Sequence, residues 1–135
     1  MTPEPDPAKV RTFASATTLR QWLKANHASE NELWIKVFKV KTGKPSVSWT
    51  ELVMEALCWG WIDGIKKSID GEAYLQRITP RKPRSSWSKR NREHAERFIG
   101  EGRMQEPGLA QLRAAKADGR WKKAYVPSEM KLPAD

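Results

Sequence analysis

An alternating pattern over residues 32–40 constrains the fold more than any other feature of the chain. Leu33, Ile35 and Val37 occupy every second position, so they would share one face of an extended strand. On the other face, aromatic and aliphatic residues alternate with Lys36. The pattern therefore predicts a strand here and, with it, a sheet.

The other patterns place helices on both sides of this strand in the sequence. Ser48 and Glu51 are spaced as a capping box at the start of a helix that Gly60 would end. Asp70-Gly71 is a turn signal between two short strands. The expected elements are helices over about residues 19–28, 48–59, 88–99 and 108–118 and strands over about 32–40, 61–65 and 73–78. This order predicts a small α+β fold, with a short, mostly antiparallel sheet covered by about four helices.

The length of 135 residues is most simply that of one domain. We expect a flexible leader over residues 1–10, a single α+β domain over residues 11–126 and a loose C-terminal tail over residues 127–135. The sequence shows no internal repeat and no linker between domains.

Several classes of site have no signal in the sequence. The single cysteine, Cys58, cannot form an intramolecular disulfide, and no residues have the spacing of a zinc site. There is no Gly-rich phosphate loop, and the isolated His27 and His94 favour structural or surface roles, so we expect no metal and no cofactor. The N-terminal residues are Pro-rich and polar, which predicts no secretory signal, no membrane span and a cytoplasmic location.

The segment Pro80–Arg92, called the basic segment below, carries six cationic side chains, three serines and a tryptophan in thirteen residues. It is expected to run from a loop into a helix that Ser86 or Ser88 caps. Free backbone N–H groups and the positive end of the helix dipole suit an anion at such a place. The candidate ligand-binding residues are Arg81, Lys82, Arg84, Ser86, Trp87, Ser88, Lys89 and Arg92. The alternative for the whole segment is a solvated charged face. For Trp87 itself, we favour a role as the anchor of the loop over stacking on the ligand.

Asp63 is the one candidate for catalysis. It lies between bulky aromatic residues and Gly64, a setting in which a carboxyl group can have a raised pKa and transfer protons. It could instead stabilise a turn, or form an ion pair with Arg81 or Arg84 that ties the basic segment to the sheet. We favour the structural ion pair over catalysis.

Linked motifs in this chain resemble a known bacterial family. The motifs are Trp59-Gly60-Trp61-Ile62-Asp63-Gly64, Pro80-Arg81, Ser86-Trp87-Ser88-Lys89-Arg90-Asn91, Gly102-Arg103-Met104 and Ala117-Asp118-Gly119-Arg120-Trp121. Together they are similar to the YdeI/OmpD-associated (OmdA-like) family over about residues 33–125. The resemblance implies a single small α+β domain and a role in bacteriocin protection or in association with an outer-membrane porin. It brings no catalytic residues to this chain.

These observations favour a non-catalytic binding module over an enzyme. The formal net charge of +9 favours polyanions, phosphorylated ligands or anionic membrane surfaces as partners. We expect the basic segment to bind an anionic ligand that contains phosphate, or nucleic acid. The alternatives are a protein that acts through a protein partner in envelope stress or bacteriocin protection, and an enzyme that uses Asp63 on a small anionic substrate.

Overall fold

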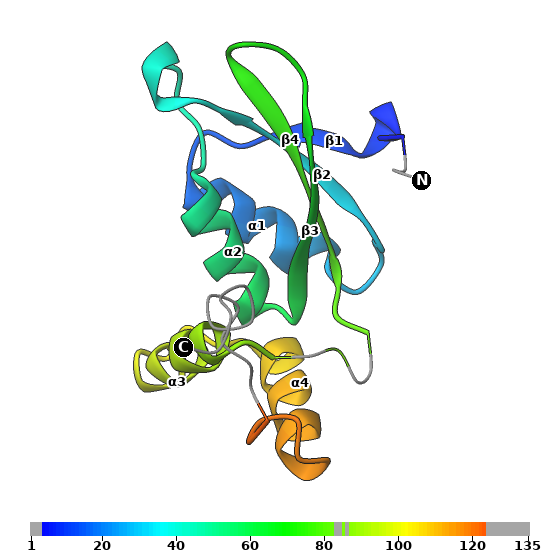
Figure 1. Cartoon of the computed structure of the whole chain (residues 1–135), viewed down its shortest axis with the longest axis vertical. Helices are drawn as coiled ribbons and strands as arrows, with labels where there is room; N and C mark the ends of the chain where they lie inside the picture. The colour runs from blue at the N-terminus through cyan, green and yellow to red at the C-terminus, as the bar shows by residue number, and fades with distance from the viewer. Residues whose placement is uncertain (1–3, 83–84, 86, 124–135) are drawn as a thin grey trace, which may run out of the picture. The chain divides into compact units, whose positions relative to one another are not determined.

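The computed structural model of the chain describes residues 4–82, 85 and 87–123 (Figure 1). The chain divides into two compact units, and each is described by itself. The first unit comprises residues Met1–Ala56 and Trp61–Pro80, and the second comprises Leu57–Gly60 and Arg81–Asp135. The predicted tail over residues 127–135 lies outside the described residues.

The first unit contains a four-stranded mixed sheet in the order β1-β2-β4-β3. Its strands are β1 (Val10–Thr12), β2 (Leu33–Phe38), β3 (Trp61–Ser68) and β4 (Ala73–Pro80). β1 pairs with β2 in parallel, and the other two pairs are antiparallel. The predicted α+β fold with a mostly antiparallel sheet is therefore confirmed.

The short strand β1 was not predicted. Residues 1–10 were expected to form a flexible leader, yet Pro7–Lys9 form a 3-10 helix and Val10 pairs with Trp34 of β2. Asp6 caps this turn by accepting a hydrogen bond from the Ala8 N–H. Three residues are too few for a visible alternation, so only pairing with β2 makes this segment a strand.

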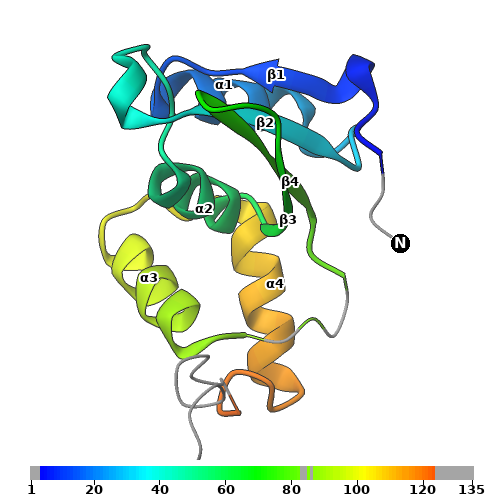
Figure 2. The ribbon, with the colours of Figure 1, turned by 45° about the horizontal axis from the view of Figure 1, so that its top comes forward.

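The predicted face of β2 lies in the core. Leu33, Ile35 and Val37 are buried, and Leu33 pairs with the buried Ile78 of β4. The helix α1 (Ala16–Asn26) lies alongside β1 and β2 (Figure 2). Its Trp22 meets Trp61 of β3 edge to face, with ring centroids 5.9 Å apart.

The two α-helices that begin in the first unit both start at capping boxes. In α1 the Ser15 hydroxyl accepts from the Thr18 N–H, and the Thr18 hydroxyl accepts from the Ser15 N–H. This cap starts the helix three residues before the predicted Leu19. In α2 (Trp49–Cys58) the predicted pair of Ser48 and Glu51 makes the same two reciprocal bonds.

The sequence did not predict the ion pair that joins these two helices. Arg20 of α1 donates from Nε and Nη2 to the two carboxylate oxygens of Glu55 of α2, at 3.0 and 2.9 Å. Glu55 is only 2% exposed, so its charge depends on such a bidentate partner. Helical spacing alone places Glu55 on the inward face of α2 but does not identify the cation that meets it.

The hairpin between β3 and β4 has the predicted turn and an unpredicted bulge. Asp70 Oδ1 accepts from the N–H groups of Glu72 and Ala73, and these bonds lower the pKa of the Asp70 carboxyl. The register shifts between Asp63 and Lys66. The buried Gln76 side chain donates from Nε2 to the Gly64 carbonyl at 2.9 Å, which stabilises the bulge.

The second unit is built on α3 (Lys89–Gly100) and α4 (Glu106–Ala117). Ala95 and Phe98 of α3 are fully buried, and their spacing of three residues places them on one face of the helix. The N–H of Gln105, just before α4, donates to the Cys58 carbonyl at 3.0 Å. α4 begins two residues earlier than predicted because Gln105 is its N-cap and Pro107 suits its first turn.

Among the residues that the structure describes, no helix is both long enough and apolar enough to cross a membrane.

Candidate functional site

The candidate residues of the basic segment fall into buried and exposed groups. Arg81 and Trp87 are 4% and 2% exposed, and Ser88 is also buried. Lys82 and Lys89 are exposed. Arg84 and Ser86 lie outside the described residues. The described part of the segment is therefore a buried frame that carries exposed lysines.

Trp87 is the anchor of this frame. The guanidinium carbon of Arg81 lies 4.0 Å from the centroid of the Trp87 ring, within cation–π range. Trp121 meets the same indole with ring centroids 5.1 Å apart. Because Trp87 is buried by these contacts, it anchors the segment and does not present a face for stacking on a ligand.

Hydrogen bonds hold the backbone of the segment around Ser85. The Arg81 N–H donates to the Gly60 carbonyl at 2.9 Å, and its Nη1 donates to Ser85 Oγ at 3.2 Å. The Ser85 N–H closes a turn on the Lys82 carbonyl. Arg120 then donates from Nη1 to the Ser85 carbonyl at 2.8 Å. Arg81, Lys82 and Arg120 thus fix the position of Ser85.

Arg120 and Trp121 were missed as parts of this site. The sequence did not connect them to the basic segment, because they follow α4 and lie far from that segment in sequence. Arg120 is oriented by the Asp118 carboxylate, which accepts from its Nε at 2.7 Å. No local pattern predicts that Arg120 and Trp121 contact the basic segment. The Asp-Gly-Arg-Trp motif is the one sequence signal that could have marked these two residues as candidates.

Two more candidate residues serve the start of α3. Ser88 is the N-cap, since its Oγ accepts from the Asn91 N–H at 3.0 Å. Arg92 donates from Nη1 to the Trp121 carbonyl at 3.2 Å, and its Nε lies 3.7 Å from a carboxylate oxygen of Glu96. Both side chains are therefore engaged within the second unit.

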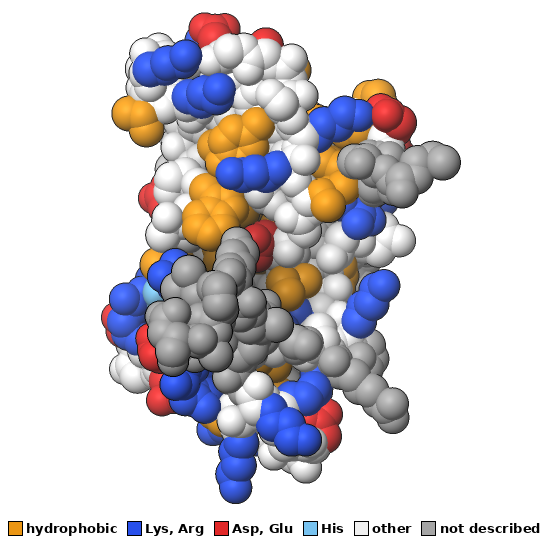
Figure 3. All heavy atoms as spheres, in the orientation of Figure 1, with side chains coloured by type: hydrophobic (Ala, Val, Ile, Leu, Met, Phe, Trp, Pro, Cys, Tyr) orange, Lys and Arg blue, Asp and Glu red, His pale blue; other side chains and the backbone are white. Residues whose placement is uncertain are grey.

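Most of the positive charge belongs to the second unit. Its sequence contains fourteen Lys and Arg against seven Asp and Glu, a formal net charge of +7. The first unit contains eleven against nine, a net charge of +2. Many cationic side chains (blue) lie on the lower half of the face shown in Figure 3, with acidic side chains (red) among them. The exposed cations with no ion pair to any described residue include Lys82, Lys89, Arg90, Lys122 and Lys123.

Comparison with known proteins identifies a family. Residues 11–111 match the family described as domain of unknown function DUF8412. The chain belongs to this family. No curated protein and no solved structure matches the chain.

The DUF8412 match covers most of the candidate residues. It includes Asp63 and the whole basic segment, and it ends within α4 at residue 111, before Arg120 and Trp121. The resemblance to the YdeI/OmpD-associated family and the cytoplasmic location stay predictions.

Asp63 occupies a defined place in the sheet. It pairs with Ile78 of β4, immediately before the bulge, and it is half-buried. It belongs to the first unit and Arg81 belongs to the second, and the ion pair between them stays a prediction. No three or more His, Cys, Asp or Glu side chains in the described part of the chain are grouped to hold a metal ion.

His94 of α3 stacks on Phe98, with ring centroids 6.1 Å apart. Burial lowers the pKa of His94 below its ordinary value, and the positive charges of Arg97 and Arg90 lower it further. The charge of Glu93 acts in the opposite direction. The folded protein therefore binds a proton at His94 less readily than the unfolded chain does.

A pH-dependent stability follows from this lowered pKa. As the pH falls through about 6.5, the ordinary pKa of histidine, the unfolded chain takes up a proton before folded His94 does, so stability is lost. At higher pH both states are neutral at this residue and the penalty is absent. We expect His94→Gln to remove this loss. Urea unfolding of the wild-type and His94→Gln proteins at neutral pH and near pH 5 measures this loss of stability. Equal pH dependence of stability in the two proteins would contradict the prediction.

Proposed function

We propose that this protein is a non-catalytic binding module that holds a phosphate-containing anion, such as nucleic acid, through the second unit. The observation that carries the proposal is the net charge of +7 on that unit. Electrostatic attraction of this kind concentrates polyanions without requiring a shaped pocket.

The geometry of the basic segment supports a specific part for Lys82 and Lys89. Both side chains are exposed, and along the chain Lys82 directly follows Arg81 while Lys89 lies two residues after Trp87. Lys89 is the first residue of α3, where the helix dipole adds positive potential. Arg81 and Arg120 hold Ser85, which lies between the two lysines in sequence, and such ordering before binding lowers the entropy cost of binding.

The test is a titration of a fluorescent single-stranded oligonucleotide at several salt concentrations, with tripolyphosphate as a competitor. We expect the logarithm of affinity to fall with the logarithm of salt concentration by about 0.7 per phosphate contacted. K82Q/K89Q would remove two contacts and make this slope shallower by about 1.4.

K39Q/K41Q is the matched control, because it removes the same charge from exposed positions of the first unit. It should keep the wild-type slope apart from a small change in long-range attraction. A wild-type slope near zero, or equal losses in the two double variants, would overturn the proposal. Competition by tripolyphosphate without oligonucleotide binding would restrict the ligand to small phosphorylated molecules.

A further inference from the structure

The segment from Lys36 to Trp49 exposes apolar side chains on the first unit. It runs from the end of β2 to the first residue of α2 and is called the lysine-rich loop below. Val40 lies in the 3-10 turn Val40–Thr42 and is 97% exposed. Trp49, at the start of α2, is 40% exposed, the most of any tryptophan in the described residues. Side chains this exposed contribute little to the core, so they suggest a surface that a partner covers on binding.

The same segment is rich in lysine. The loop contains Lys36, Lys39, Lys41 and Lys44 and no acidic residue. The ammonium groups of Lys36 and Lys44 lie 5.1 and 4.9 Å from the centroid of the Phe38 ring. Hydrophobic side chains (orange) lie beside cationic ones (blue) in the upper half of Figure 3.

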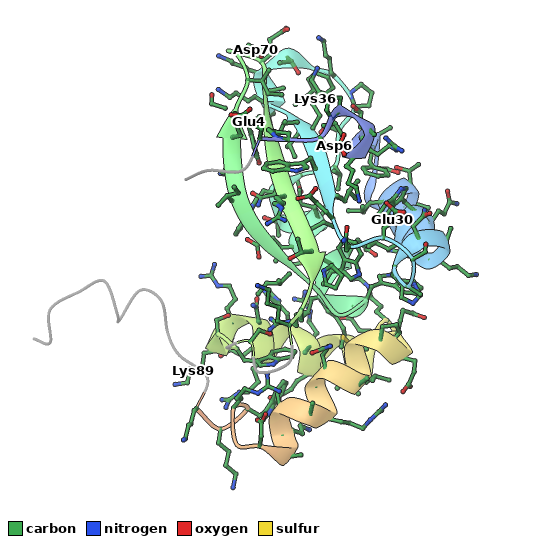
Figure 4. The ribbon with its side chains drawn as sticks, turned by 90° about the vertical axis from the view of Figure 1, so that its right-hand side faces the viewer. Glu4, Asp6, Glu30, Lys36, Asp70 and Lys89 are labelled. Atoms are coloured by element: carbon green, nitrogen blue, oxygen red, sulfur yellow. The ribbon has the colours of Figure 1, made fainter. Side chains whose placement is uncertain are left out.

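The β3–β4 hairpin lies beside the lysine-rich loop. The Lys39 N–H donates to the Glu72 carbonyl at 2.8 Å, and Lys44 Nζ lies 3.6 Å from the Glu72 carboxylate. Ile69 in this hairpin is also exposed. Asp70, labelled at the tip in Figure 4, uses its carboxylate to bind backbone N–H groups. Two loop tips with exposed aliphatic side chains therefore lie together, with more lysines than acids around them.

We propose that the lysine-rich loop docks on an anionic membrane surface. Val40 and Ile69 would enter the headgroup region, Trp49 would occupy the polar interface that tryptophan prefers, and the lysines would contact lipid phosphates. Lysine suits this position because its aliphatic stem tolerates an apolar setting while its ammonium group stays at the surface.

The contacts of Phe38 disfavour single-stranded nucleic acid as the occupant. Proteins that bind single strands stack bases on open aromatic faces, whereas the Phe38 ring already carries two ammonium groups. The most exposed large hydrophobic residue of the loop is the aliphatic Val40, which offers no ring for stacking. Both features agree with a lipid surface.

The test is co-sedimentation of the full chain with vesicles of phosphatidylcholine alone or mixed with phosphatidylglycerol. We expect binding only to the anionic vesicles. Each lysine near an anionic surface contributes about 1 kcal/mol, roughly fivefold in affinity, so K39Q/K41Q should weaken binding about 25-fold. K82Q/K89Q removes equal charge from the second unit and should bind vesicles nearly as wild type does.

Two variants test the apolar contacts separately. Val40→Gln should weaken vesicle binding about fivefold or more at any salt concentration, because it removes burial of an aliphatic side chain and no charge. Its side chain makes no core contact, so the fold should be unchanged. Brominated lipids should quench the tryptophan fluorescence of the bound protein, and Trp49→Phe should remove most of that quenching.

Three results would overturn the proposal. The first is no binding to anionic vesicles at low salt, and the second is a K39Q/K41Q protein that binds them as well as wild type. The third is loss of oligonucleotide binding, and not of vesicle binding, in K39Q/K41Q, which would assign the loop to nucleic acid. The proposed function of the second unit is judged by K82Q/K89Q, so failure of one proposal leaves the other standing.

Discussion

Replacing Trp87 by alanine is expected to lower the free energy of unfolding by about 3–5 kcal/mol, the usual cost of truncating a buried aromatic side chain. Trp87 is 2% exposed and contacts both Arg81 and Trp121. Its removal would leave a cavity beside a buried guanidinium group, which depends on the indole for its cation–π contact. Urea unfolding followed by circular dichroism measures the loss.

Trp87→Phe is the matched control for this prediction. The indole Nε1 has no hydrogen-bond acceptor among the described residues, so phenylalanine loses no hydrogen bond that the structure shows. It keeps a ring for Arg81 and should cost about 1–2 kcal/mol, for the smaller volume. An alanine variant as stable as the phenylalanine variant would show that Trp87 does not anchor the basic segment.

Replacing Gly108 by alanine is expected to cost about 1–3 kcal/mol, through overpacking against main-chain atoms. A Cβ at this position would lie 2.4 Å from the Cys58 carbonyl oxygen and 2.8 Å from its carbon. Neither is the end of a flexible side chain, so the start of α4 would have to move. The hydrogen bond from the Gln105 N–H to the same carbonyl would lengthen with it.

Gly100→Ala separates this steric effect from helix propensity. Gly100 is the last residue of α3, and a Cβ there would meet nothing within 4 Å. Alanine favours a helix by about 1 kcal/mol over glycine, so this variant should be neutral or more stable. If chemical unfolding gives the same change in the free energy of unfolding for Gly100→Ala and Gly108→Ala, close packing at Gly108 is not the cause of the lower stability of Gly108→Ala.

Much of the local structure was predictable because its signals lie close together in sequence. The alternation of Leu33, Ile35 and Val37 identified β2, and the spacing of Ser48 and Glu51 identified the capping box of α2. Asp70-Gly71 marked the hairpin turn, where the Asp70 side chain closes on nearby N–H groups. Each signal depends on contacts within a few residues.

The candidate site was predictable as a segment but not as a set of contacts. Six cations within thirteen residues located the basic segment, and Ser88 caps α3 as one of the two proposed serines. The sequence could not distinguish the buried Arg81 from the exposed Lys82, because both are cations in one loop. That distinction depends on Trp87 and on Arg120, which approaches from beyond α4.

The sequence by itself determined the α+β class, the main helices and strands and the concentration of positive charge in the basic segment, because periodicity, caps and charge are local properties. Only the tertiary structure decided that β1 joins the sheet, that Arg20 meets Glu55, and that Trp87 anchors its segment instead of presenting a face to a ligand. These outcomes depend on pairing between residues distant in sequence, and burial by such partners determines which charges stay available for binding.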